Sequence, residues 1–135
     1  RIEGYVGATG AMAGMYGERF SAEPDLLDAL ERRLAGRGLL YIDPRAGKPD
    51  PRAVIGRATD VEVDKPAIAS VIKANLVKLE AIAKRRGSAL GVVGWPGPRT
   101  VQELMSWAAR LPADGLVLAP VTALVRRPVA AEAKR

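Results

Sequence analysis

The sequence predicts an α/β fold in which parallel strands alternate with helices. Short apolar runs recur along the chain, and an amphipathic helical pattern follows most of them after a short connection. The clearest unit is the apolar run 89–93, a Gly- and Pro-rich loop over 94–98, and a helix that opens at Thr100. Because each strand precedes a helix by a short connection, we expect neighbouring strands to run parallel. The expected strands are too few to close an eight-stranded barrel, so an open sheet or half of a barrel remains.

The N-terminal part of the chain contains two predicted strands and one predicted helix. Residues 4–8 favour a first strand, and the Gly-rich segment 9–17 favours a loop. A proline in the first turn begins a helix over 24–35, whose leucines recur at helical spacing. The apolar run 39–42 predicts the second, buried strand.

The middle of the chain contains the longest predicted helix. Residues 53–58 are interpreted as a short helix that follows a proline. Residues 60–64 alternate acidic and apolar side chains, which is typical of a short strand or an extended edge. Residues 66–86 then carry apolar side chains at helical spacing, with a glycine after the last turn.

The C-terminal part repeats the strand-to-helix pattern. Thr100 lies three residues before Glu103, which is the spacing of a capping box, and the helix is expected over 100–111. The apolar residues 116–118 predict a final buried strand, and residues 121–125 predict a last helical turn.

Length and composition indicate a soluble globular domain. The chain has 135 residues, of which 48% are apolar and 27% are charged. No apolar run approaches the roughly 20 residues that a membrane-spanning helix needs. The start of the chain is not a signal peptide and lacks an initiator Met, so we expect a processed chain or a piece of a longer one.

The chain contains no Cys and no His, which excludes several kinds of site. Disulfides, thiolate metal sites, Cys nucleophiles and Ser-His-Asp triads are all ruled out for these residues. Any metal ion would need oxygen ligands, a set that hard cations prefer.

The formal net charge is +6, and part of it lies in the basic tail 126–135. We interpret this tail as disordered and solvated, or as a linker. The alternative is contact with nucleic acid or an anionic envelope polymer. Aromatic residues make up only 4% of the chain and are not interleaved with basic ones, which argues against a nucleic-acid-binding module.

Several segments together carry a resemblance to a known family. They are Gly4-Tyr5-Val6-Gly7 with Gly17-Glu18-Arg19-Phe20, then 37–45, 60–64, 79–91, 98–107 and 118–124. In this order and spacing they resemble the divergent polysaccharide deacetylase family, a branch of the NodB-like carbohydrate deacetylases. The resemblance runs over most of residues 4–125, and residues 126–135 are expected to lie outside the domain.

The resemblance implies a fold and an activity. The fold is an irregular parallel β/α barrel of the glycoside hydrolase/deacetylase type, of which this chain would cover roughly the second half. The activity is metal-assisted hydrolysis of an acetyl group on an envelope or extracellular carbohydrate, with a divalent metal as cofactor and a location in the periplasm or cell envelope. The partners implied are a carbohydrate substrate and the missing N-terminal half of the barrel, or another chain. The chain alone is therefore expected to be inactive.

Asp43 and Arg45 flank a proline at the end of the second strand. There a carboxylate and a guanidinium could bind a metal or a sugar hydroxyl, with Arg45 polarising an acetyl carbonyl. The alternative is a structural ion pair in the mouth of the barrel. Asp64 ends another strand just before a helix, where it is either a second metal-binding and catalytic carboxylate or a helix N-cap.

Arg19 and Trp95 are the expected substrate-binding residues. Arg19 follows a Gly-rich loop, where its alternative role is to anchor the loop or face solvent. Trp95 occupies the position where the family often carries a His before a Pro, which puts the family's general acid in question. Its indole is interpreted as a stacking platform for a sugar ring or as a half-buried lid. The alternative function is a non-catalytic relative that binds glycan or an envelope protein.

Overall fold

The computed structural model describes residues 3–10 and 17–128. The chain divides into two compact units, which we name the first unit (1–58 with 125–135) and the second unit (59–124). Each unit has its own parallel strand pairing and its own apolar core. The α/β fold with parallel strands is therefore confirmed.

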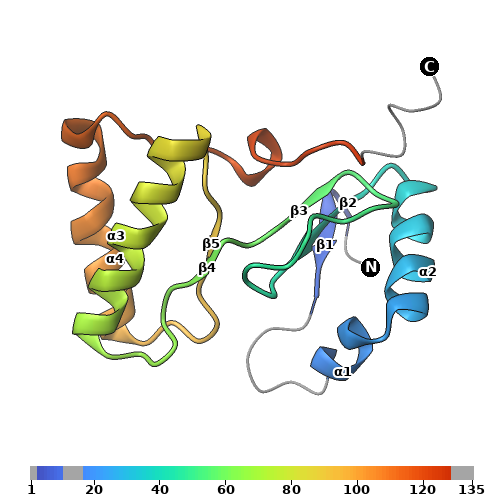
Figure 1. The fold of residues 1–135 in the computed structure, drawn as a ribbon, viewed down its shortest axis with the longest axis horizontal. Helices are drawn as coiled ribbons and strands as arrows, with labels where there is room; N and C mark the ends of the chain where they lie inside the picture. The colour runs from blue at the N-terminus through green and yellow to red at the C-terminus, as the bar shows by residue number, and fades with distance from the viewer. Residues whose placement is uncertain (1–2, 11–16, 129–135) are drawn as a thin grey trace. The chain divides into compact units, whose positions relative to one another are not determined.

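The first unit contains a three-stranded parallel sheet in the order β1-β2-β3 (Figure 1). Its strands are β1 (Gly7–Thr9), β2 (Leu40–Asp43) and β3 (Gly56–Ala58). Helices α1 (Gly17–Ala22) and α2 (Pro24–Ala35) lie between β1 and β2 in the chain, and α2 contacts β2. The helix expected over 24–35 is confirmed, whereas α1 begins at the end of a segment expected to be a loop.

Residues 53–58 do not form the predicted helix; their last three residues form β3. The reason is a long-range contact. The buried carboxylate of Glu31 on α2 accepts the backbone N–H groups of Arg52 and Ala53, each at 2.9 Å. These bonds hold the chain ahead of β3, and β3 itself pairs in parallel with β2, so its backbone groups form hydrogen bonds between strands and not within a helix.

The second unit contains a pair of short parallel strands, β4 (Val61–Glu62) and β5 (Gly91–Val92). Helices α3 (Ala69–Arg86) and α4 (Pro98–Arg110) contact each other, and α3 also contacts β4. The 3-10 helices η1 (Leu111–Asp114) and η2 (Val121–Ala123) follow. The strands expected within 60–64 and 89–93 are thus present and pair in parallel.

Helix boundaries in the second unit differ from the prediction at the N-terminal ends. The N-cap of α4 is Gly97, and Thr100 lies inside the helix with 1% of its surface exposed, so the predicted capping box is wrong. The C-terminal end of α3 is as expected, because Gly87 adopts a left-handed φ of 84° after Arg86.

Residues 116–118 form no strand, contrary to the prediction. Val117 is 80% exposed and Leu118 is 66% exposed. Gly115 turns the chain with a φ of 73°, and the N–H of Leu116 returns to the carbonyl of Leu111 at 3.0 Å. An apolar run becomes a strand only where another strand accepts its backbone groups, and no described strand pairs with this one.

The apolar cores gather where the helices meet the strands. In the first unit, Leu34, Tyr41 and Val54 form the buried cluster. In the second unit, residues of β4, of α3 and just after β4 form two buried clusters that both pack against the half-buried Trp107. Their members are Val61, Leu79 and Ile82, and Val63, Ile72 and Leu76. Among the described helices, none combines the length and apolar character that a membrane crossing requires.

Candidate functional site

The end of β2 holds a buried carboxylate bound by a neighbouring arginine. Asp43 is 3% exposed. Its Oδ1 accepts the Arg45 backbone N–H at 2.9 Å and the Nε–H at 3.0 Å, while its Oδ2 accepts Nη2–H at 2.6 Å. The hydrogen bond to Asp43 raises the pKa of Arg45 further above its ordinary value. The pair predicted from the Asp-Pro-Arg sequence is therefore a bidentate ion pair.

Tyr41 lies on the same strand, two residues before Asp43. Its side chain is 1% exposed, and its hydroxyl has no partner with hydrogen-bond geometry in the described part of the chain. Burial raises the pKa of Tyr41, the negative charge of Asp43 raises it further, and the nearby Ser21 hydroxyl lowers it. The phenol is therefore neutral at physiological pH, and no sequence pattern pointed to it.

The ion pair with Asp43 holds the partly exposed Arg45 guanidinium at the end of β2. Both Asp43 oxygens already accept hydrogen bonds from Arg45, so the carboxylate orients the guanidinium. The Arg45 side chain is 28% exposed, which leaves part of the guanidinium open to a ligand. A fixed guanidinium can donate N–H groups to a carbonyl oxygen on which negative charge develops.

Asp64 lies just after β4 and binds the loop that follows β5. Its Oδ1 accepts the N–H of Gly94 at 2.9 Å, and its Oδ2 accepts the N–H of Trp95 at 3.1 Å. Asp64 is only 8% exposed. The helix N-cap interpretation is wrong, because the N-cap of α3 is Ile68. The two backbone donors were not foreseen, since they lie 30 and 31 residues away in the sequence.

The two remaining candidates are both exposed. The Trp95 side chain stands in solvent, with 83% of its surface exposed. Arg19 lies on α1 and is also exposed. Among the described residues, no hydrogen bond or ion pair joins Arg19 to Asp43 or Arg45.

The five candidates thus fall into two groups. Asp43 and Arg45 are bonded to each other in the first unit, which also contains Arg19, whereas Asp64 and Trp95 are bonded in the second unit.

The proposed metal ligands Asp43 and Asp64 were tested against the structure. No group of three or more His, Cys, Asp or Glu that could hold a metal ion occurs within the described ranges. Each oxygen of both carboxylates already accepts a hydrogen bond from the protein. The described residues therefore do not fit a metal centre of their own, and we derive no step through a metal ion.

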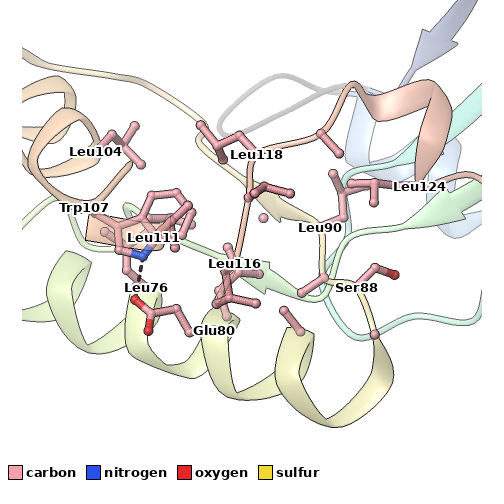
Figure 2. A pocket seen from close by; sticks show the side chains of 18 of the residues that line it. Leu76, Glu80, Ser88, Leu90, Leu104, Trp107, Leu111, Leu116, Leu118 and Leu124 are labelled. Carbon is pink, nitrogen blue, oxygen red and sulfur yellow. Dashed lines mark hydrogen bonds between the residues drawn. The ribbon is translucent and has the colours of Figure 1, made fainter. Parts of the chain in front are cut away.

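A cavity of about 410 Å³ lies within the second unit (Figure 2). Its wall is mostly apolar and includes side chains of α3, α4 and the segment 115–119. The Glu80 carboxylate on this wall accepts the indole N–H of Trp107 at 2.7 Å, drawn dashed in Figure 2. None of the five candidates lines this cavity.

Comparison with known proteins adds a family and one solved structure. The chain matches the family model described as divergent polysaccharide deacetylase over residues 1–125. It is also similar to the crystal structure of an uncharacterized protein from Agrobacterium tumefaciens C58, with a TM-score of 0.74 and 28% sequence identity. That match covers 90% of this chain and 50% of the other, so this chain spans about half the length of the solved protein. No curated protein matches the chain.

Proposed function

The chain belongs to the divergent polysaccharide deacetylase family, and from this premise we propose that it serves the hydrolytic removal of acetyl groups from an envelope or extracellular carbohydrate. The observation that carries the proposal is the Asp43–Arg45 pair at the carboxyl end of β2. In parallel α/β folds, ligands bind at this end of the strands.

In the proposed reaction, Arg45 contacts the acetyl group. Water adds to the acetyl carbonyl carbon, negative charge develops on the carbonyl oxygen, and the guanidinium donates N–H groups to that oxygen. The bond from the acetyl carbon to the sugar nitrogen or oxygen then breaks, and acetate leaves while that atom takes up a proton from the added water. Asp43 holds Arg45 in place throughout, so little reorganisation is needed as charge develops.

The proposal includes three expectations that come with the family. They are the irregular β/α barrel, completed by an N-terminal half or another chain, a location in the periplasm or cell envelope, and a divalent metal. Because the two carboxylates examined do not fit a metal centre, its ligands are not assigned to them.

The test is acetate release from chitin oligomers or peptidoglycan fragments by the intact gene product. We expect Asp43→Asn to lower kcat by at least about tenfold, the low end for losing a charge-stabilising group. Leu27→Met, a volume-conserving change beside the core of the first unit, should barely alter the rate. We expect no release from residues 1–135 alone. Equal rates for Asp43→Asn and the control would assign the pair a purely structural role.

The second candidate function is glycan or envelope-protein binding without catalysis. The chain has no His, which favours it. The family resemblance also implies that Trp95 stands at a position where relatives often carry a His. Binding of a chitin oligomer by an intact gene product that releases no acetate would favour this function over hydrolysis.

A further inference from the structure

We infer that Asp64 is a positioning residue that holds the loop after β5 so that Trp95 forms a stacking platform for a sugar ring. The choice of a sugar as the ligand rests on the proposed function. The platform itself is built entirely within the second unit.

The anchor of the platform is the buried Asp64 carboxylate. The parallel register places Val61 opposite Gly91, and the N–H of Val63 donates to the carbonyl of Val92 at 2.8 Å. The next residues of the two segments therefore lie side by side, and Asp64 receives two backbone N–H groups from the loop. Hydrogen bonds to an ionised carboxylate are about twice as strong as neutral ones, so this contact restrains the loop backbone.

The platform surface is the exposed Trp95 indole. Burying so large an aromatic side chain is favourable, and Trp107 in the same unit is half-buried against the core. The anchored backbone instead leaves 83% of Trp95 in water. Pro96, the next residue, and Arg99, four residues further along the chain, are also exposed. An exposed indole offers a flat face for the C–H side of a sugar ring, and an exposed arginine in the same segment offers N–H donors for sugar hydroxyls.

A sugar fits this surface better than a single-stranded nucleic acid does. Proteins that bind single strands stack successive bases on several aromatic side chains. The segment from Gly94 to Arg99 contains one aromatic residue. One ring can be stacked here, and recognition beyond it would come from hydroxyl contacts.

The experiment follows the two indole N–H signals of the 135-residue chain by ¹H–¹⁵N NMR. Trp95→Ala assigns them, because the chain has two tryptophans. Titration with chitotetraose should shift the Trp95 signal and leave that of Trp107, which is bonded to Glu80, unchanged. Trp95→Ala should weaken binding by at least about tenfold. Val77→Ala, which removes an exposed apolar side chain from α3, should leave binding unchanged.

The positioning role is tested by Asp64→Ala and the conservative Asp64→Asn. We expect Asp64→Ala to lower the heteronuclear NOE of the Trp95 indole and to weaken chitotetraose binding, without lowering the NOE of Trp107. Asp64→Asn keeps one acceptor oxygen and should bind with intermediate affinity. This graded response separates positioning from a general loss of fold.

Three outcomes would overturn the inference. They are unchanged binding in Trp95→Ala, an equally ordered Trp95 in Asp64→Ala, and a shift of the Gly94 and Trp95 amides on addition of Zn²⁺ or Mg²⁺ alone that Asp64→Asn abolishes. Chitotetraose binding through Trp95 in a protein without acetate release would support the platform and count against the proposed hydrolysis. Acetate release that Trp95→Ala leaves unchanged would support the proposed hydrolysis and count against the platform.

Discussion

The buried carboxylate of Asp43 and the guanidinium of Arg45 are joined through both carboxylate oxygens, two residues apart in the chain. The backbone N–H of Arg45 also donates to Oδ1, so the turn around Pro44 is closed by the same carboxylate that receives the side chain. Asp43 therefore both anchors the loop backbone and holds the Arg45 guanidinium at the end of β2. Removing the Asp43 carboxylate should therefore disturb both features, whereas removing the Arg45 side chain leaves the backbone hydrogen bond in place.

Arg45→Ala should lower the free energy of unfolding by about 1–3 kcal/mol, because it leaves the buried Asp43 carboxylate without its side-chain donor. Urea unfolding of the 135-residue chain measures the change. The matched control is Arg32→Ala, which removes the solvent-exposed partner of Asp28 one helical turn away and should cost less than about 0.5 kcal/mol. Equal losses in the two variants would contradict the importance given to burial of Asp43.

Tyr41→Phe should leave stability at neutral pH unchanged or raise it by about 1 kcal/mol, because it removes a buried hydroxyl without a well-formed hydrogen bond. The folded state raises the pKa of Tyr41 above its ordinary 10.0. The stability that this pKa difference contributes is therefore fully present below pH 10.0 and is lost as the pH rises through the folded-state pKa.

The pH dependence of Tyr41→Phe is measured by thermal melts between neutral and strongly alkaline pH. The variant should lose less stability above pH 10.0 than the parent chain does. Tyr5→Phe, at a residue that is 52% exposed, should follow the parent curve. A markedly lower melting temperature of Tyr41→Phe at pH 7 would show that the hydroxyl has a stabilising partner.

Gly56→Ala should destabilise the first unit by about 1–3 kcal/mol through overpacking. A Cβ at Gly56 would lie 2.1 Å from the backbone oxygen of Tyr41, which would push β3 away from β2. Gly36→Ala is the control, since its Cβ would meet nothing closer than 3.5 Å and its φ of −62° suits any residue. That change should be neutral or stabilising by up to about 1 kcal/mol. Similar melting temperatures for the two variants would contradict the close approach of the strands.

Leu118→Ala should change the free energy of unfolding of the 135-residue chain by less than about 0.5 kcal/mol, because this side chain is largely exposed. Leu76→Ala, the same substitution at a residue that is 2% exposed, should cost about 2–5 kcal/mol. Chemical denaturation compares them directly. A large loss of stability in Leu118→Ala would instead indicate that residues 116–118 are buried, as the sequence predicted.

Local pattern was enough to predict most elements of this protein. The helix α2 and the C-terminal end of α3 follow from helical spacing and terminal residues, and the parallel pairing of β4 with β5 follows from the order of strands and helices. The Asp43–Arg45 pair was also accessible from the sequence, because its two members are neighbours in the chain. In each case, the information lies within a few consecutive residues or in the order of elements.

Contacts between distant residues settled the rest. Residues 53–58 favour a helix locally, but the Glu31 carboxylate from α2 binds the backbone ahead of β3. Asp64 was interpreted from its own neighbours as a metal ligand or a helix cap, whereas its oxygens bind N–H groups 30 and 31 residues away. A backbone N–H is common to all residues except proline, so no side-chain pattern reveals which donors a carboxylate will reach. Only the parallel pairing of β4 with β5 brings those donors to Asp64 and leaves Trp95 exposed in solvent.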